Sequence, residues 1–315
     1  MMAQAPAGPP AGPPAALPAP APSPAGPPAG PLVRALLGDG LARLCTALLA
    51  GVILLALVGP VLSPWGVEDI DWAALEAPPS ADHWFGTDLI GRDLFTRAAA
   101  GARVSLAIAA IATRETVVIG VTYGAIAGFM GGRIDNLMMR IVDVLYALPF
   151  VLLVILLVVV FGRNPYLLFA GLGAVFWLDL ARIVRGQTLR VRHAGFVEAA
   201  RAMGAGPATI IRRHVLPNVA GPALVYATLT VPGVILAESF ISFLGLGVQE
   251  PDTSLGVLIA DGAQTMESAP WALVFPALLL AVTVWSVNML GDRLRDELDA
   301  RPGPGGRAAA RGGYN

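Results

Sequence analysis

The chain has 315 residues, of which 56% are hydrophobic and only 14% are charged, a composition typical of membrane proteins. All 21 basic residues are Arg, and the absence of Lys excludes a P-loop and a Lys Schiff base. The single Cys45 excludes an intrachain disulfide and a cysteine metal cluster. The three histidines lie far apart in the sequence and do not favour a metal site: His83, His193 and His214.

Residues 1–31 consist almost entirely of Ala, Pro and Gly, and the unit AGPP recurs at 7–10, 11–14 and 25–28. Such a segment has no apolar face to bury, so we expect a disordered, partly polyproline-II tail. It lacks the basic and apolar regions of a signal peptide. We expect a solvated extension, with a binding role as the alternative.

The first predicted membrane span runs from about Leu41 to Leu62, because roughly 20 apolar residues suffice to cross the hydrocarbon core. Arg34 and Arg43 come before or at its start, which indicates a cytoplasmic N-terminus. Residues 63–100 are then external, and they contain seven acidic residues against two basic ones.

The second predicted span, about Arg103–Phe129, carries Arg114 and Glu115 near its middle. Charges at that depth are costly and usually face a cavity or a neighbouring helix. Adjacent helical residues point about 100° apart, so the two do not simply neutralise each other. The pair could line a pathway, be satisfied by neighbouring spans, or mark a shifted span; we favour neighbouring spans.

Two more spans follow a short basic segment, residues 131–140, which we expect to be a cytoplasmic loop. The third span covers about Ile141–Phe161, and Pro149 would allow a kink in it. An external turn at Gly162–Pro165 leads into the fourth span, about Tyr166–Ile183.

The only long polar interval in the C-terminal two thirds runs from Arg185 to Asn218, with six Arg residues and Glu198 as its one acid. It is expected to form two short helices joined at Gly204–Gly206, because a left-handed residue suits the end of an Ala-rich helix. Pro207 suits the first position of the next helix. A structured basic loop between two spans indicates contact with a cytoplasmic partner.

The fifth predicted span, about Ala220–Leu246, is expected to be broken by Pro222 and Pro232. Residues 247–270 contain acids and no base, so they are predicted to be external. The sixth span covers about Trp271–Leu290 and is followed by an Arg-rich tail.

Glu238 lies inside the fifth span beside Ser239 and Ser242. A membrane carboxyl can line a translocation path, be protonated, or hydrogen-bond across helices. A pathway role and a structural hydrogen bond stay equally open for these three residues.

The charge pattern predicts an all-α membrane protein with six transmembrane helices and both termini in the cytoplasm, because Arg collects on one side and the acids on the other. Continuous apolar runs exclude a β-barrel. The predicted parts are a tail (1–31), a first helix with its external loop (32–100), a five-helix transmembrane domain (101–297) containing the basic loop (185–218), and a flexible tail (298–315). No nucleophile–base–acid set is visible, so we predict a transporter subunit and not an enzyme.

Three stretches carry a family resemblance. The EAA loop of ABC importer permeases resembles the pattern formed here by Glu198-Ala199-Ala200, Gly204 and Leu216-Pro217. The histidine at position 214, where the general pattern has Ile, is similar to the pattern of the peptide-permease branch. Residues 83–106 and 235–251 are similar to the external signature and to the fifth span with its exit loop in C-type dipeptide/oligopeptide permease subunits. The resemblance covers about residues 41–297; the N-terminal tail, Arg114-Glu115 and Leu255, where the family often has Trp, depart from it.

The resemblance implies a type I ABC importer of the bacterial cytoplasmic (inner) membrane. Its implied partners are a homologous permease subunit, two ATPase subunits, an extracytoplasmic substrate-binding protein and the lipid bilayer, with no nucleic acid. The chain would bind no cofactor or metal, and ATP and Mg would be used by the ATPases. The residues implied in ATPase coupling are Glu198, Ala199, Ala200, Arg201, Gly204, His214, Leu216 and Pro217.

The external motif implied by the resemblance consists of Gly86, Thr87, Asp88, Gly91, Arg92 and Asp93. It would lie near the docking face for the binding protein, or it would be a capped turn that stabilises the start of the second span; we favour the capped turn. Glu198 would either contact the ATPase or hold the loop's own fold.

The implied function is ATP-driven uptake of di- or oligopeptides by alternating access. Within the family, nickel chelates, glutathione, opines or cationic antimicrobial peptides are alternative substrates. An ion-driven secondary transporter or channel, and an intramembrane enzyme, are alternatives from other classes. The sequence shows no convincing internal repeat, which disfavours a secondary transporter. It shows no catalytic set, which disfavours an intramembrane enzyme.

Overall fold

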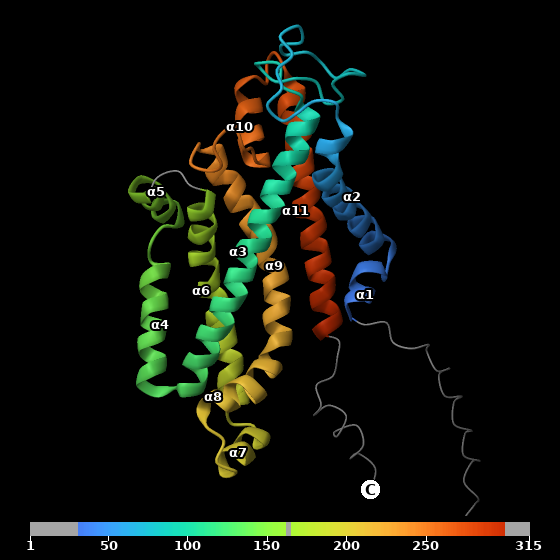
Figure 1. Cartoon of the computed structure of the whole chain (residues 1–315). Helices are drawn as coiled ribbons and strands as arrows, with labels where there is room; N and C mark the ends of the chain where they lie inside the picture. Colours follow the sequence, from blue (N-terminus) through green and yellow to red (C-terminus); the bar gives the residue numbers. More distant parts are fainter. Residues whose placement is uncertain (1–30, 162–164, 300–315) are drawn as a thin grey trace, which may run out of the picture.

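The longest helix, α3 (Leu94–Met130), has 37 residues and runs along most of the length of the molecule (Figure 1). It begins at the N-cap Asp93, whose carboxylate accepts a hydrogen bond from the Thr96 amide at 2.9 Å. It ends at Gly131, whose φ of +66° turns the chain directly into the next helix.

The computed structural model describes residues 31–161 and 165–299. The predicted tails 1–31 and 298–315 lie outside the described residues, apart from Pro31 at one boundary and the end of the last helix at the other. Most of the predicted external turn that precedes the fourth span also lies outside them.

Three glycines on α3 set its closest packing, against α6 (Pro165–Val191). Gly120, Gly124 and Gly128 are spaced four residues apart and therefore share one helix face. A Cβ atom on Gly120 would come within 2.9 Å of the Leu180 side chain, so only glycine permits this approach. Small residues at such intervals allow membrane helices to pack closely.

Three other long helices complete the bundle around α3 and α6: α2 (Gly40–Leu62), α9 (Leu216–Phe243) and α11 (Pro270–Asp299). The buried core between α3, α6 and α9 is made of aliphatic side chains, as expected for membrane helices. These side chains include Ile108, Leu172, Val234, Ile235 and Ile241.

Four helices in the described part of the chain are long and apolar enough to cross a membrane: α2, α3, Pro207–Phe243 and α11. The helices α4 (Gly132–Tyr146) and α5 (Phe150–Phe161) add a fifth span only if they are counted together, since they meet at an angle of 82°. The architecture is therefore all-α and multi-spanning, as predicted.

Three details differ from the sequence-based expectations. Residues 131–140 form most of α4 and not a loop, because Gly131 and Gly132 with positive φ allow one helix to follow another directly. The third span is broken between Tyr146 and Phe150 rather than kinked at Pro149.

The expected break in the fifth span is wrong. α9 continues through Pro222 and Pro232 as one helix. Proline is tolerated inside membrane helices, where neighbouring groups and local adjustments satisfy the freed backbone carbonyls.

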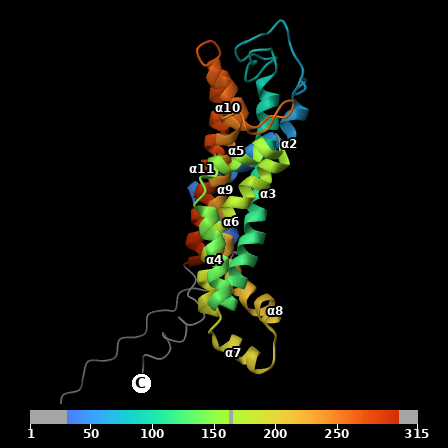
Figure 2. The same cartoon turned by 90° about the vertical axis from the view of Figure 1, so that its left-hand side faces the viewer.

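Shorter helices lie at the two ends of the bundle. α1 (Pro31–Leu37) precedes α2, and α10 (Leu255–Gln264) lies within the segment predicted to be external. α10 begins at Ser254, whose hydroxyl accepts a hydrogen bond from the Val257 amide. α10 and the loop before α3 lie together at the end opposite α7 (Gly195–Ala202) and α8 (Pro207–Ile210) (Figures 1 and 2).

Candidate functional site

The basic interval forms one tip of the molecule, built from α7 and α8 (Figure 2). This unit is shorter than the predicted range 185–218. Residues 185–191 complete α6, and the chain passes from α8 through a π-helical turn, η1 (Ile211–Val215), into α9. The two-helix arrangement predicted from the sequence is confirmed.

The turn between the two helices has the hydrogen bonds of a Schellman motif. The Ala205 amide donates to the Ala200 carbonyl at 3.0 Å, and the Gly204 amide donates to the Arg201 carbonyl at 2.9 Å. Gly204 has a φ of +84°, which is the left-handed conformation expected there. Pro207 occupies the start of α8, as predicted.

One face of this tip is anchored in the bundle. Val197, Ala200 and Ile210 are buried in a cluster with Phe129 of α3 and residues of α6 and α9. The Arg201 guanidinium lies over the Phe129 ring at 5.1 Å, a cation–π contact that also holds α7 against α3. These contacts make α7 a helix with a fixed position on the transmembrane bundle.

The opposite face of the tip is exposed. Glu198 and Ala199 are exposed on α7, and Met203 at its end is 81% exposed. Among the described residues, Glu198 makes no ion pair and no side-chain hydrogen bond. Its carboxylate is therefore available for contact with another molecule. Ala200, two residues further along α7, is buried in the cluster instead.

The last predicted loop residues lie beside this tip. His214 is half-buried, and its ring centroid lies 6.1 Å from that of Phe196 on α7. Leu216 and Pro217 form the first turn of α9, which continues directly from the π-helical turn η1, and the Leu216 amide donates to the Ile211 carbonyl.

The external motif forms a compact polar loop at the other end of the molecule. The Asp88 carboxylate accepts hydrogen bonds from the backbone amides of Ile90 and Arg92, and from Arg92 Nε at 2.7 Å. Gly86 and Gly91 have φ values of +76° and +86°, so both positions require glycine.

Thr87 connects this loop to two other segments. Its hydroxyl donates to the Ala74 carbonyl and accepts from the Ala77 amide at 2.8 Å. Its own carbonyl accepts from Trp271 Nε1 at 3.2 Å, at the start of α11. The threonine therefore fixes the external loop to the bundle.

Asp93 caps α3, and His83 orients it. His83 Nδ1 lies 3.0 Å from Asp93 Oδ1, while the other Asp93 oxygen accepts from the Thr96 amide and hydroxyl. The His83 ring stacks on Trp65 with centroids 4.6 Å apart. The capped turn favoured from the sequence is thus present at Asp93; Asp88 caps the loop and not the helix.

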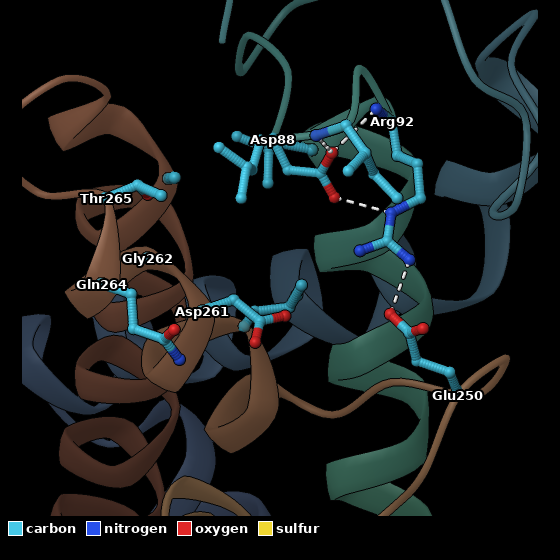
Figure 3. Close-up of a pocket in the computed structure, with 12 residues that line it drawn as sticks. Asp88, Arg92, Glu250, Asp261, Gly262, Gln264 and Thr265 are labelled. Carbon is cyan, nitrogen blue, oxygen red and sulfur yellow. Dashed lines mark hydrogen bonds and ion pairs between the residues drawn. The ribbon is translucent and has the colours of Figure 1, made fainter. Parts of the chain in front are cut away.

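A cavity of about 270 Å³ opens between this loop and α10 (Figure 3). Its polar lining combines Asp88 and Arg92 with Glu250 and Asp261, two acids that were not singled out from the sequence. Arg92 Nη1 donates to Glu250 Oε1 at 2.7 Å. The pocket thus joins the external motif to the segment after α9.

The pKa values of Glu250 and Asp261 are shifted in opposite directions. The hydrogen bond from Arg92, together with its positive charge, lowers the pKa of Glu250 below its ordinary value. Burial raises the pKa of Asp261, although the positive charge of Arg97 opposes that shift.

Glu238 is fully buried and hydrogen-bonded across helices. Its carboxylate accepts from Ser105 of α3 at 2.9 Å and from Ser242 of α9 at 2.8 Å. The Ser239 hydroxyl lies at the longer distance of 3.4 Å. Ser105 also accepts from the Leu255 amide at 3.2 Å, which brings α10 into the cluster.

The structure thus brings the predicted residues together in three separate places: the α7–α8 tip, the external loop and the buried Glu238 cluster. The sequence assigned no role to Ser105, Glu250 or Asp261. Ser105 lies within the signature at residues 83–106, but its pairing with Glu238, 133 residues away, has no local signal. The acids of residues 247–270 were recognised only as an external charge excess.

The sequence profile of the family described as binding-protein-dependent transport system inner membrane component matches residues 120–303. The oligopeptide transport system permease protein OppC of Haemophilus influenzae is 50% identical over 256 residues, covering 81% of this chain and 82% of that protein. The dipeptide transport system permease protein DppC of Bacillus subtilis is 46% identical over 269 residues, covering 85% and 84%.

A solved structure of the MetNI methionine ABC transporter, in an inward-facing conformation, has a TM-score of 0.51 and 24% identity. The match covers 62% of this chain and 94% of that one, and it shows a shared fold. On the profile match and the two sequence identities, the chain belongs to the family of inner membrane components of binding-protein-dependent transport systems.

Proposed function

We propose that this chain is a permease subunit of an ATP-driven importer that carries di- or oligopeptides across the cytoplasmic (inner) membrane of a bacterium. The observation that carries the proposal is the α7–α8 tip, which is anchored by buried Val197, Ala200 and Ile210 and exposes Glu198 and the adjacent turn. The names of the OppC and DppC relatives support peptides as the substrate class.

Six spans with both termini in the cytoplasm fit this function. α6 would supply the span beyond the four apolar helices and the bent α4–α5 pair. This arrangement puts the α7–α8 tip, with Arg201 and the flanking Arg192, Arg212 and Arg213, in the cytoplasm and the acidic loop before α3 outside, in agreement with the positive-inside bias.

The α7–α8 tip would then serve as the coupling element between the permease and one of two ATPase subunits. ATP and Mg would be bound by those subunits, and this chain would hydrolyse nothing. Because Val197, Ala200 and Ile210 fix the tip to α3, α6 and α9, a displacement of the tip by the ATPase would reach the transmembrane helices. The tip and the bundle can move as one body only while these contacts hold.

At the outer end, the pocket between Asp88, Arg92 and Glu250 would lie on the face that receives a substrate-binding protein. A homologous permease subunit would complete the translocation path. Alternation between inward-open and outward-open states would then need no reactive group in this chain, only two arrangements of helices biased by the partners.

Uptake of labelled dipeptides, oligopeptides and nickel, in cells with and without this chain, tests the proposal. We expect peptide uptake to be lost on deletion and to be sensitive to vanadate. Nickel uptake lost with peptide uptake intact would overturn the substrate class, and uptake independent of any ATPase would overturn the transporter class.

A substitution at the turn tests the coupling role. A Gly204→Asp variant should insert into the membrane normally but lose ATPase stimulation and uptake, since it places a negative charge at the exposed turn that would contact the ATPase. Full uptake and full ATPase stimulation by this variant would contradict the coupling assignment.

A further inference from the structure

Arg114 lies near the middle of α3, far from both ends. The helix continues for 16 residues beyond it to Met130, so the nearer end is about 24 Å away at 1.5 Å per residue. When a helix of this length is centred on a hydrocarbon core of about 30 Å, Arg114 falls close to the bilayer midplane. At that depth lipid offers no hydrogen-bond acceptor for a guanidinium. Exposing the Arg side chain to lipid there costs about 3 kcal/mol on the membrane-insertion scale.

Within the part of the chain whose side chains the structure describes, no group satisfies this charge. Arg114 is exposed, and among the residues whose side chains the structure describes it has no ion pair and no hydrogen bond. Its neighbour Glu115 is turned toward α6, where the missing side chain of Gly173 leaves room for the carboxylate. Intramolecular satisfaction of this pair, the explanation favoured from the sequence, therefore finds no support for Arg114.

Arg114 belongs to an exposed face of α3 that we name the α3 stripe: Arg103, Ala107, Ala110, Arg114 and Val118. These residues recur every three or four positions and so lie on one side of the helix. The first three also line an apolar groove of about 610 Å³ between α2 and α3. Small residues such as Ala107 and Ala110 let another helix approach closely.

The surroundings of Arg114 distinguish two kinds of occupant. An aqueous translocation path needs polar neighbours, whereas Ala107, Ala110 and Val118 offer an apolar surface suited to a packed helix. An arginine inside such an interface pairs with an acid or with backbone carbonyls, and the carbonyls of a regular helix are already hydrogen-bonded within that helix, so an acid on the opposing helix is the better partner. Charge complementarity and the small-residue stripe thus both favour a helix that carries an acid.

We propose that the α3 stripe packs against a transmembrane helix of the second permease subunit, and that a carboxylate of that helix pairs with Arg114 near the bilayer midplane. The inference rests on the proposed function, which supplies the second subunit. It identifies a charged contact within the membrane that would specify which permease chains assemble.

The first test is cross-linking in the assembled complex. Val118→Cys, in a Cys45→Ser background and labelled with benzophenone maleimide, should yield a covalent adduct with the second permease subunit after illumination. Leu278→Cys is the matched control, because Leu278 is an exposed residue of α11 that lies outside the α3 stripe. It should give much less adduct. Absence of the Val118 adduct, in a complex that still contains both permease subunits, would overturn the proposal.

The second test changes the charge. Arg114→Glu should lower the recovery of the second permease subunit with tagged chain at least tenfold, and an arginine replacing the paired acid should restore it. Arg133→Glu, exposed on α4, makes the same charge change elsewhere and should leave recovery unaltered. The Val118 adduct keeps the proposal testable if Arg114→Glu fails to fold.

Two results would speak against a helix partner. Full recovery of the second subunit with Arg114→Glu would overturn the pairing. Normal recovery combined with loss of uptake for peptides with a free carboxylate, but not for amidated peptides, would instead place Arg114 in the translocation path. Failure of the proposed function is distinguishable, because the unmodified chain would then recover no second permease subunit at all.

Discussion

Ser105 and Glu238, which lie 133 residues apart in the chain, form a fully buried hydrogen bond of 2.9 Å between α3 and α9. The same serine accepts from the amide of Leu255, the first residue of α10. One carboxylate and one hydroxyl therefore hold three helices together near the α10 end of the bundle. The geometry favours the cross-helix role for Glu238 over a pathway role, since no part of its side chain is exposed.

Replacing Glu238 should mainly affect stability. Glu238→Ala leaves the Ser105 and Ser242 hydroxyls without their acceptor, at a cost of about 1–3 kcal/mol for each orphaned buried group. Glu238→Gln keeps one carbonyl acceptor and should fall between the parent and the alanine variant. Thermal unfolding of the purified complex in detergent measures the order.

Uptake kinetics provide the control for this prediction. If Glu238 acts structurally, the glutamine variant should lower the amount of folded complex without changing the KM for peptide. A changed KM with an unaltered melting temperature would place the carboxylate in the pathway and contradict the structural assignment.

The glycine face of α3 gives a second prediction. A side chain at Gly124 would collide with the Ala181 carbonyl oxygen of α6, and neither backbone can move without separating the helices. Gly124→Ala should therefore cost about 1–3 kcal/mol, and Gly124→Leu should prevent assembly of the bundle. Protease resistance of the protein in membranes reports the loss.

Gly186 is the matched control for Gly124. It lies on α6, and a Cβ added there meets no atom within 4 Å. Gly186→Ala should be neutral or slightly stabilising, because alanine favours the helix by about 1 kcal/mol over glycine. Equal effects of the two alanine substitutions would mean that close packing of α3 on α6 is not what Gly124 provides.

The long apolar helices and the local turns of the fold could be predicted from the sequence, because each depends on the residues of one continuous segment. Long apolar runs predicted α2, α3, α9 and α11, and the Gly204 turn was expected from the end of an Ala-rich helix. The glycine face at Gly120, Gly124 and Gly128 was also readable as a small-residue repeat, but it was not recognised. The continuity of α9 through Pro222 was mispredicted, because packing overrides the local preference of proline.

The candidate site was harder to predict, because its partners meet only in the fold. The external motif was identified from its own residues, whereas its ion pair with Glu250 joins Arg92 to a position 158 residues away. The exposure of Glu198 and the burial of its near neighbour Ala200 also depend on how α7 docks against α3. Sequence spacing gives the faces of α7 but not which of them meets the bundle.

A third prediction concerns the backbone at the tip. Gly204 has a φ of +84° with open space around its Cβ position, so a side chain there meets strain and no collision. Gly204→Ala should cost about 1–2 kcal/mol, and Gly204→Asn should cost less, since asparagine tolerates the left-handed region. ATPase stimulation by the reconstituted complex should decrease in the same order.

Gly206 is the control that tests whether the effect at Gly204 comes from backbone strain or from the loss of any glycine in this turn. Its φ of −71° is accessible to every residue, and its Cβ position is also open. Gly206→Ala should therefore retain ATPase stimulation close to that of the parent chain. A decrease equal to that of Gly204→Ala would show that the left-handed turn is not the feature that matters.

The fourth prediction is a pH dependence of the contact between Arg92 and Glu250. Because Arg92 lowers the pKa of Glu250, the contact contributes stability above the pKa of the unfolded state, near 4, and this contribution is lost as pH falls through the folded-state pKa. The Glu250 side chain is 64% exposed, so solvent screening limits the contribution to under about 1 kcal/mol. Glu250→Gln should be slightly less stable than the parent at pH 7, and the two should converge below about pH 4.

Denaturant unfolding of the complex at pH 7 and at acidic pH measures this difference. Glu267→Gln, exposed in the same external segment, removes an acid without removing the Arg92 contact and should show no such convergence. High salt should reduce the effect of Glu250→Gln at pH 7, since an exposed ion pair is screened at a Debye length of about 3 Å in 1 M salt. A difference that stays constant from pH 7 to below pH 4 would mean that Glu250 acts through packing rather than through its charge, because only a charge-dependent contact disappears when the carboxylate is protonated.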